Sequence, residues 1–306
     1  MTVTVQLMGG LGNQLFQIFT TLTYASKNGH KVVFLASDKL GDGIHTTQRT
    51  TYWNTLFKSL TPFLTSDYSK IAGIAGQITV RETGFTYDHS ININYNPNYL
   101  ITLIGYFQSY KYFQSHIDTI IRMLNFRILR ARVISNIKIP GAEHTVAIHF
   151  RLGDYKKYPK YHPILSTKYY INALLYILNT VHKTKSPNNP PLNVICFYDK
   201  SDADDIITIK NTLTHIREVF FESDMIIHSD IIPHNVSDWE ELLLMSSCRH
   251  HVIANSSFSW WGAYLADSLN DTTTPHLVCY PSTWFGIDAT HNTRDLFPTH
   301  WHNIDS

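Results

Sequence analysis

The sequence predicts an α/β fold of two domains, and three observations lead to that class. The chain has 306 residues, about twice the usual size of a domain. It opens with a strand–helix–strand pattern, and its second half alternates strand-like with helix-like segments. Hydrophobic residues make up 43% of the chain, which excludes a disordered protein. We expect domains at 1–138 and 139–306, joined through the segment 130–144, which contains Pro140-Gly141.

The first domain begins with a β-α-β unit, the seed of a parallel sheet. Residues Val3 to Met8 alternate as a strand does, and a helix with an apolar face follows and ends at Asn28-Gly29. Beyond it, the expected elements are a strand at 31–36, mixed short elements over 37–98, a buried strand at 101–105 and a long helix at 109–129.

The second domain shows a cleaner alternation, which is typical of a doubly wound sheet. A Ser-x-x-Glu pattern from Ser237 to Glu240 predicts a capping box at one helix start, and Ser201 is the expected cap of another. The expected strands are 145–151, 192–198, 217–221, 250–254 and 276–280, and the expected helices are 167–180, 202–214, 238–248 and 257–269.

Charge, cysteines and hydropathy exclude several classes of protein. Lys and Arg number 25 and Asp and Glu 24, so the net charge of +1 argues against a nucleic-acid partner. The three cysteines form no Cys-x-x-Cys pair and the 17 histidines show no zinc-enzyme spacing, so we expect neither a metal nor another cofactor. No signal-peptide pattern or long apolar stretch occurs, so we expect a cytoplasmic protein without a transmembrane segment.

Three segments combine polar side chains with a strand-to-helix turn, where open α/β sheets bind ligands. The first runs from Gly9 to Gln14 and reads GGLGNQ. Its glycines let a ligand approach the backbone, and the helix start offers N–H groups to an anion. It is neither a Walker loop nor a complete dinucleotide fingerprint. The alternative is a tight turn that binds nothing. The candidate binding residues are Gly10, Gly12, Asn13 and Gln14.

The second segment covers 146–155 and carries His149, Arg151 and Asp154 where a strand ends. Strand alternation puts His149 and Arg151 on the same side. A guanidinium can hold two phosphate oxygens at once, and Asp154 is near enough to orient it or a substrate hydroxyl. We name all three as candidate catalytic residues. The alternative for Arg151 and Asp154 is an ion pair that only braces the strand end.

The third segment, 254–261, reads ANSSFSWW, and its hydroxyls at a helix start form a second anion cradle. Trp260 and Trp261 project about 100° apart, so at least one of them is expected in the core. Two cradles and Arg151 predict a nucleoside diphosphate with two domains closing around it. Since no Asp-x-Asp motif lies beside them, Arg151 and helix dipoles, rather than a metal, would meet the charge on a leaving diphosphate.

Five motifs in this order make the chain resemble glycosyltransferase family 11, the α-1,2-fucosyltransferases. They are GGLGNQLFQ at 9–17, GYFQSYKYF at 105–113, HFRLGDY at 149–155, DWEELLLMSSCRHHVIANSSFSWWGAYL at 238–265 and YPSTWFG at 280–286. The resemblance implies a GT-B-like fold, in which two Rossmann-like domains face a central cleft. The acceptor side would be 1–138, and 139–306 would bind GDP-fucose. It further implies inverting, metal-independent transfer of L-fucose from GDP-β-L-fucose to the 2-hydroxyl of a galactose-terminated oligosaccharide acceptor.

The resemblance also implies roles for particular residues. Arg151 would hold the donor β-phosphate, with His149 and Asp154 shaping the same pocket, and Asp154 is a candidate general base. Asn13 would reach the diphosphate or the fucose. Asp199 matches a family acid that contacts guanine or ribose, whereas Lys200 stands where the family carries a second acid. The residues implied to line the GDP site are Asn255, Ser256, Ser257 and Phe258.

Two alternative functions stay open at the level of the sequence. One is a nucleotide-sugar-binding protein that has lost turnover, favoured by Lys200 and the poorly patterned segment 37–98. The other is a related transferase with a different donor or acceptor.

Overall fold

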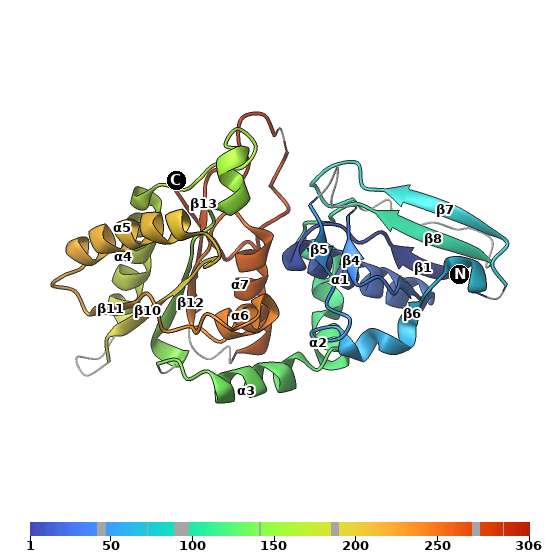
Figure 1. Cartoon of the computed structure of the whole chain (residues 1–306), viewed down its shortest axis with the longest axis horizontal. Helices are drawn as coiled ribbons and strands as arrows, with labels where there is room; N and C mark the ends of the chain where they lie inside the picture. The colour runs from blue at the N-terminus through green and yellow to red at the C-terminus, as the bar shows by residue number, and fades with distance from the viewer. Residues whose placement is uncertain are drawn as a thin grey trace. The chain divides into compact units, whose positions relative to one another are not determined.

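The computed structural model describes residues 1–41, 47–71, 73–88, 98–140, 142–184, 190–270, 276–289 and 291–306. The chain forms two compact units, both drawn in Figure 1. Unit 1 comprises Met1–Leu129 and His291–Pro298, and unit 2 comprises Arg130–Thr290 and Thr299–Ser306. The chain therefore enters unit 2 somewhat before the boundary expected at 138, and a short C-terminal segment returns to unit 1.

Unit 1 is built on a parallel sheet with the strand order β2-β1-β8-β7. Helix α1 packs against β1 and β2, and it ends at Gly29, whose φ of 63° and N–H bond to the Ala25 oxygen form the predicted C-cap. The elements are β1 (Thr2–Val5), α1 (Leu11–Asn28), β2 (Lys31–Val32), β7 (Gly76–Arg81) and β8 (Tyr99–Ile104).

The other elements of unit 1 are short, and two expectations for them are wrong. The expected strand at 31–36 is split, since β2 pairs with β1 whereas β3 pairs with β6. The expected helix at 109–129 is broken at Asn125, whose φ of 57° suits asparagine better than most residues. These elements are β3 (Phe34–Leu35), β4 (Lys39–Leu40), β5 (Arg49–Thr50), β6 (Leu64–Thr65), α2 (Ile117–Met123) and 3₁₀ turns at 58–63, 68–70, 110–112 and 114–116.

Helix α3 (Phe126–Asn136) carries the chain from unit 1 into unit 2. Arg130, on this helix, donates to the backbone oxygens of Ser246 and Leu269, so it is anchored in unit 2. The first part of the segment expected to connect the domains, 130–136, therefore belongs to α3, and a 3₁₀ turn at 142–144 then leads into the sheet of unit 2.

Unit 2 contains a parallel sheet in the order β11-β10-β9-β12-β13-β14. Counted along the chain within the unit, this order is 3-2-1-4-5-6, the arrangement of dinucleotide-binding doubly wound domains. The strands are β9 (Thr145–His149), β10 (Leu192–Phe197), β11 (Met225–His228), β12 (His250–Val252), β13 (Val278–Pro281) and β14 (His302–Ile304). The helices are α4 (Thr167–Thr184), α5 (Ala203–Val219), α6 (Asp238–Met245) and α7 (Ser257–Leu269), with a 3₁₀ turn at 153–157.

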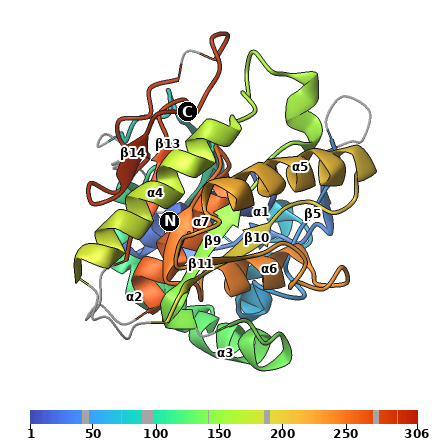
Figure 2. The same ribbon diagram turned by 90° about the vertical axis from the view of Figure 1, so that its left-hand side faces the viewer.

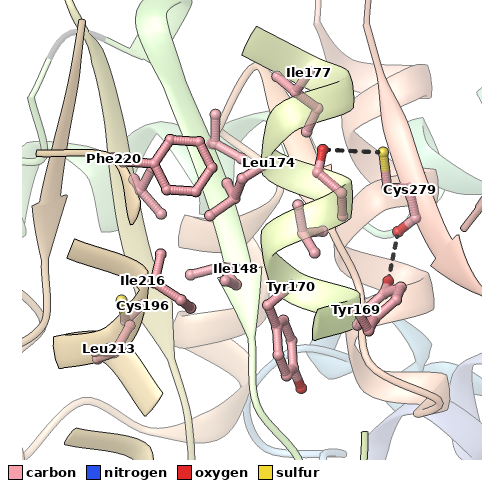
Figure 3. Close-up of a cluster of buried hydrophobic side chains, with 14 of the residues drawn as sticks. Ile148, Tyr169, Tyr170, Leu174, Ile177, Cys196, Leu213, Ile216, Phe220 and Cys279 are labelled. Atoms are coloured by element: carbon pink, nitrogen blue, oxygen red, sulfur yellow. Dashed lines mark hydrogen bonds between the residues drawn. The ribbon is translucent and has the colours of Figure 1, made fainter. Parts of the chain in front are cut away.

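Helices cover both faces of this sheet. Figures 1 and 2 show α4 and α5 on one face, with α6 and α7 on the other. Figure 3 shows the core beneath α4 and α5, where Ile148 and Leu174 are fully buried. The Tyr169 hydroxyl donates to the backbone oxygens of Ile253 at 2.6 Å and Cys279 at 3.2 Å, which pins α4 to the ends of β12 and β13. The α/β class with parallel sheets is confirmed, whereas the arrangement of the units around a cleft stays a prediction.

The expected strand at 217–221 is wrong, because helix α5 continues to Val219. Ile209, Leu213 and Ile216 are buried at helical spacing and Phe220 continues this stripe, whereas Val219 and Phe221 are exposed. The strand that follows is β11, a few residues later.

The two predicted caps have different outcomes. Ser237 and Glu240 form the predicted capping box at α6, which is confirmed. Asp202 rather than Ser201 caps α5, because its carboxylate accepts the N–H groups of Asp204 and Asp205. In the described ranges, no helix is both long and apolar enough to cross a membrane.

Candidate functional site

The strand order of unit 2 reverses at β9, and this reversal locates its candidate site. From β9 the chain winds outward through β10 and β11, and it then crosses back to β12 on the other side. Open α/β sheets bind ligands outside the carboxyl ends of the strands at such a switch point. Arg151 follows β9 and Asn255 follows β12, and Ile148 pairs with Val252 between them. The second and third predicted segments therefore meet at this edge.

The chain turns sharply after β9 at Gly153, and a buried carboxylate holds this turn. Gly153 has a φ of 51°, in the left-handed region that favours glycine. Its N–H donates to Oδ2 of Asp205 at 2.7 Å, and the other oxygen of Asp205 lies 2.6 Å from Nζ of Lys156. Sequence reasoning missed Asp205, since it belongs to α5 and lies outside every recognised motif. It sets the direction in which Arg151 and Asp154 leave the sheet.

Arg151 is held on two sides and keeps one donor without a partner. Its Nη2 donates to Oδ1 of Asp154 at 2.5 Å, so the ion pair considered as the alternative is present. Its guanidinium carbon lies 5.1 Å from the centre of the Tyr155 ring, within cation–π range. Its Nε is buried and has no hydrogen-bond partner. The neighbours thus orient the guanidinium, and the unpaired Nε–H remains available to a ligand.

Tyr155 ties the ends of β9 and β12 together. Its hydroxyl donates to the backbone oxygen of Asn255 at 2.8 Å, and its ring stacks on His162 with centres 4.6 Å apart. Burial raises the pKa of Tyr155 to about 12, so the hydroxyl stays protonated and able to donate. Sequence reasoning did not single out Tyr155, although it closes the HFRLGDY motif.

His149 is a neutral group in this site. It is 6% exposed, and burial, assisted by the charge of Arg151, lowers its pKa to about 3. Its Nδ1 is buried without a partner, and its ring lies 5.6 Å from that of Phe258. At neutral pH His149 cannot supply positive charge to a phosphate. It can offer a neutral ring nitrogen at the edge where Arg151 lies.

The side-chain amide of Asn255 is held by hydrogen bonds through its nitrogen, and its oxygen has no partner. Its Nδ2 donates to the backbone oxygens of Pro163 at 2.9 Å and Trp284 at 3.2 Å. Its Oδ1 is buried without a partner. The loops around Pro163 and Trp284 therefore fix the orientation of Oδ1, which can accept a hydrogen bond from a ligand.

Ser256 caps the start of α7, where the sequence predicts an anion cradle. The Ser256 hydroxyl accepts the N–H of Phe258 at 3.3 Å, and Ser257, the first residue of the helix, is half-buried. A helix start also leaves N–H groups that no residue of the helix can bind, and these attract anions. Trp260 and Trp261 are fully buried, which confirms core packing for both.

Asp199 and Lys200 follow β10 at the same edge of the sheet. Asp199 is exposed, and its Oδ1 accepts the N–H of Ser201 at 2.9 Å, so it shapes the turn and still faces solvent. Lys200 donates through Nζ to the backbone oxygen of Ile232. The lysine that replaces the family acid is thus bound to the loop before α6.

In unit 1 the glycine segment joins β1 to α1. Gly9 has a φ of 77°, and a Cβ there would lie 2.4 Å from Nδ2 of Asn13. Gly10 has open space around it, and Gly12 is buried in the first turn of α1. Asn13 accepts through Oδ1 from Nε2 of Gln108 at 2.9 Å. Gly9 is therefore required by the close approach of Asn13.

Gln14 was expected to bind a ligand, but its side chain lies inside the protein. It is fully buried, and its Nε2 donates to the backbone oxygens of Gly9 at 3.1 Å and Thr50 at 2.9 Å. The structure therefore gives Gln14 the task of bracing the loop, because no part of its side chain reaches the surface.

The arrangement in unit 2 offers polar atoms of both kinds at one edge. Arg151 Nε is a donor, Asn255 Oδ1 is an acceptor, and His149 Nδ1 is either one. Buried polar atoms rarely lack partners, so three at one strand edge indicate a polar ligand. Among the described residues, no group of three or more His, Cys, Asp or Glu side chains could hold a metal ion.

Comparison with known proteins gives a family match and two curated relatives. The model of glycosyl transferase family 11 matches residues 2–304. An α-1,2-colitosyltransferase of Escherichia coli is 28% identical over 224 residues, which cover 71% of this chain and 67% of that protein. The O-antigen biosynthesis glycosyltransferase WbnK of Escherichia coli is 26% identical over 210 residues, 66% of this chain and 60% of that protein. The chain thus spans about two thirds or less of these relatives' length.

Solved structures with a detectable likeness are distant. A mutant of FUT1 of Arabidopsis thaliana in complex with GDP is 13% identical, with a TM-score of 0.42 over 86% of this chain and 68% of that chain. The α-1,6-fucosyltransferase NodZ of Bradyrhizobium, soaked with GDP-fucose, is 11% identical, with a TM-score of 0.44 over 86% of this chain and 92% of that chain.

Proposed function

This chain belongs to glycosyl transferase family 11, and from that premise we propose that it transfers L-fucose from GDP-β-L-fucose to the 2-hydroxyl of a galactose-containing glycan. The reaction inverts the anomeric carbon and needs no metal. One observation supports the donor site above all others: the unpaired Nε of Arg151, the unpaired Oδ1 of Asn255 and the start of α7 share the switch-point edge of unit 2.

The proposed chemistry needs positive charge where the diphosphate leaves. The acceptor oxygen attacks the anomeric carbon opposite GDP, the bond from that carbon to the β-phosphate oxygen breaks, and the hydroxyl proton passes to base or solvent. Negative charge grows on the β-phosphate as the bond breaks. Arg151 and the N–H groups at the start of α7 are placed to stabilise it, an effect worth about 3 kcal/mol or more per donor group in comparable sites.

Asp154 has two roles in this proposal, and the geometry favours one. Its Oδ1 is bound to Arg151, so it holds the guanidinium against the diphosphate. Its side chain is 43% exposed, so an acceptor can reach it. Accepting the proton of the attacking hydroxyl is the second role, and it requires the acceptor to approach the carboxylate.

A second candidate donor follows from the relatives. The α-1,2-colitosyltransferase that is 28% identical to this chain transfers colitose by its name, so an activated colitose donor is the alternative to GDP-fucose. A colitose donor activated as a nucleoside diphosphate would meet the same diphosphate contacts.

The test is a transfer assay with the purified chain. GDP-fucose, UDP-galactose and an activated colitose donor are each offered with and without a lactose-type acceptor, and the linkage of any product is determined by NMR. We expect acceptor-dependent GDP release from GDP-fucose, an α-1,2-linked product and full activity in EDTA. Donor binding without acceptor-dependent turnover would identify an inert binding protein, a preference for UDP-galactose would refute the donor, and EDTA inhibition reversed by Mg²⁺ would refute the metal-free reaction.

A further inference from the structure

A carboxylate outside every recognised motif holds the loop that follows β8. Glu82 stands directly after β7, and its Oε2 accepts the N–H groups of Tyr106 at 2.7 Å and Phe107 at 2.9 Å. A Cβ on Gly105 would lie 2.4 Å from Cβ of Glu82, so only glycine lets the loop come this close. The ends of β7 and β8 are thereby joined through one side chain.

This contact stabilises an unusual backbone. Phe107 has a φ of 54°, a conformation that side chains other than glycine and asparagine rarely adopt. Its side chain is fully buried, and its N–H is one of the two bound by Glu82. Such residues persist only where the surroundings hold them, and they concentrate at functional sites. Glu82 holds the backbone of Phe107 in this conformation, and that conformation orients the next residue, Gln108.

Gln108 in turn orients Asn13, a residue predicted to meet the donor. Gln108 Nε2 donates to Oδ1 of Asn13, which leaves the NH₂ group of Asn13 and the carbonyl of Gln108 for other partners. Gln17 joins the same two loops, since it accepts from Met8 N–H and donates to the Gly105 oxygen, both at 3.0 Å. A fixed donor beside a fixed acceptor suits a sugar hydroxyl, which can accept and donate at once.

Glu82 acts on the loop through its bound oxygen, Oε2, which accepts both N–H groups. Its second oxygen, Oε1, is buried and has no hydrogen-bond partner. Burial raises the pKa of Glu82, although the N–H groups of Phe107 and Tyr106 partly oppose this shift. The two bonds to Oε2 are therefore the contacts through which this carboxylate can position the loop.

We propose that Glu82 is a positioning residue of the transferase, which fixes the loop 105–108 so that Gln108 and Asn13 bind a hydroxyl of the transferred sugar. The proposal rests on the proposed function and adds a residue and a sugar contact to it. It assigns this hydroxyl contact to residues of unit 1.

A double-mutant cycle tests whether Glu82 acts through Gln108. The variants are Glu82→Ala, Gln108→Ala and both together, with Glu82→Gln as the conservative variant and Asp118→Asn, an exposed acid of the same unit, as the matched control. Each is assayed for kcat/KM with GDP-fucose, for the Kd of GDP alone and for thermal unfolding. Hydrogen exchange of the Tyr106 and Phe107 amides reports on the loop.

We expect kcat/KM to fall about 10- to 100-fold in each single alanine variant, because small misplacements of binding groups have effects of this size. The double variant should lose no more than the worse single one, and Glu82→Gln, which keeps an acceptor oxygen, should recover most of the activity. The Kd of GDP should stay unchanged, Asp118→Asn should match the wild type, and amide exchange should quicken with Glu82→Ala but not with Gln108→Ala.

Two other outcomes are distinguishable. If the wild type is active and the two losses add, or if they appear in GDP binding, Glu82 does not act through Gln108, and this inference is overturned while the proposed function stands. If the wild type transfers sugar from no donor, the proposed function fails, and Glu82 has no sugar site to position.

Discussion

The candidate site depends on single polar atoms that lack partners inside the protein. Residue type and strand position identified Arg151, whereas the roles of His149 and Asn255 came from the family resemblance. Which of their atoms is unpaired could not be predicted, since this depends on distant contacts. The amide of Asn255, for example, is oriented by backbone oxygens of Pro163 and Trp284. Sequence reasoning finds the residue, and tertiary structure decides which atom it offers.

Replacing Arg151 tests the assignment at this scale. Arg151→Lys keeps a positive charge but loses the planar group that binds Asp154 and presents Nε–H together. We expect kcat/KM to fall at least ~10²-fold, because a point charge does not reproduce these contacts. Steady-state kinetics with the preferred donor provide the measurement. Arg217→Lys, an exposed arginine of α5, is the control and should be nearly silent. Near-normal turnover of Arg151→Lys would contradict the role.

At the scale of elements, sequence patterns predicted the regular helices and the central strands well. They failed where tertiary contacts decide the outcome. The break at Asn125 interrupts an apolar period that reads as one helix, and the apolar end of α5 mimics a strand at 217–221. The loops after β7 and β8, which carry Glu82 and Gln108, gave no periodic signal, because their contacts join residues far apart in the sequence.

The turn from β1 to α1 offers a test with a matched control. Gly9 and Gly29 both have positive φ, but only at Gly9 would a Cβ meet a neighbour, Nδ2 of Asn13. Each change to alanine should lower the free energy of unfolding by about 1 kcal/mol from backbone strain. Gly9→Ala should also displace Asn13 and weaken transfer. Urea unfolding and kinetics measure both effects. If Gly29→Ala lowers activity equally, Asn13 is not the cause.

For the whole molecule, the sequence predicted only part of the division into two units and of the sheet order. Alternating elements predicted a doubly wound second half, and the order 3-2-1-4-5-6 agrees with it. The return of 291–298 to unit 1 was not predicted. In this segment Asp295 accepts hydrogen bonds from Lys111 Nζ at 2.5 Å and from the N–H of Tyr87. These partners are far away in the sequence, so local patterns cannot predict the contacts.

Buried histidines make the stability of unit 2 depend on pH. Burial lowers the pKa of His149 and of His250 to about 3, and it lowers that of His251 well below the ordinary 6.5. The folded unit keeps these rings neutral, whereas the unfolded chain protonates them near pH 6.5. The stabilisation that comes from keeping these rings neutral is therefore complete above pH 6.5. As the pH falls toward 3, the free energy of unfolding decreases by about 1.4 kcal/mol per pH unit for each ring.

Glu241, Glu82 and His300 oppose this trend, because the pKa of each is raised in the folded chain. Burial raises the pKa of Glu241 to about 7, so this carboxyl adds to the free energy of unfolding as the pH falls from 7 toward 4.5. The gain offsets the loss from about one histidine. We still expect the free energy of unfolding to decrease steadily from pH 7 to pH 5. Urea unfolding at several pH values in that range measures it. A constant value between pH 7 and pH 5 would contradict neutral burial of the three rings.

The proposed function depends on where the diphosphate binds, and a crystal structure with GDP would locate it. We expect the β-phosphate beside the guanidinium of Arg151 and the first turn of α7, with Nε of Arg151 donating to a phosphate oxygen. Ordered GDP bound elsewhere, with Arg151 held only by Asp154 and Tyr155, would overturn this site.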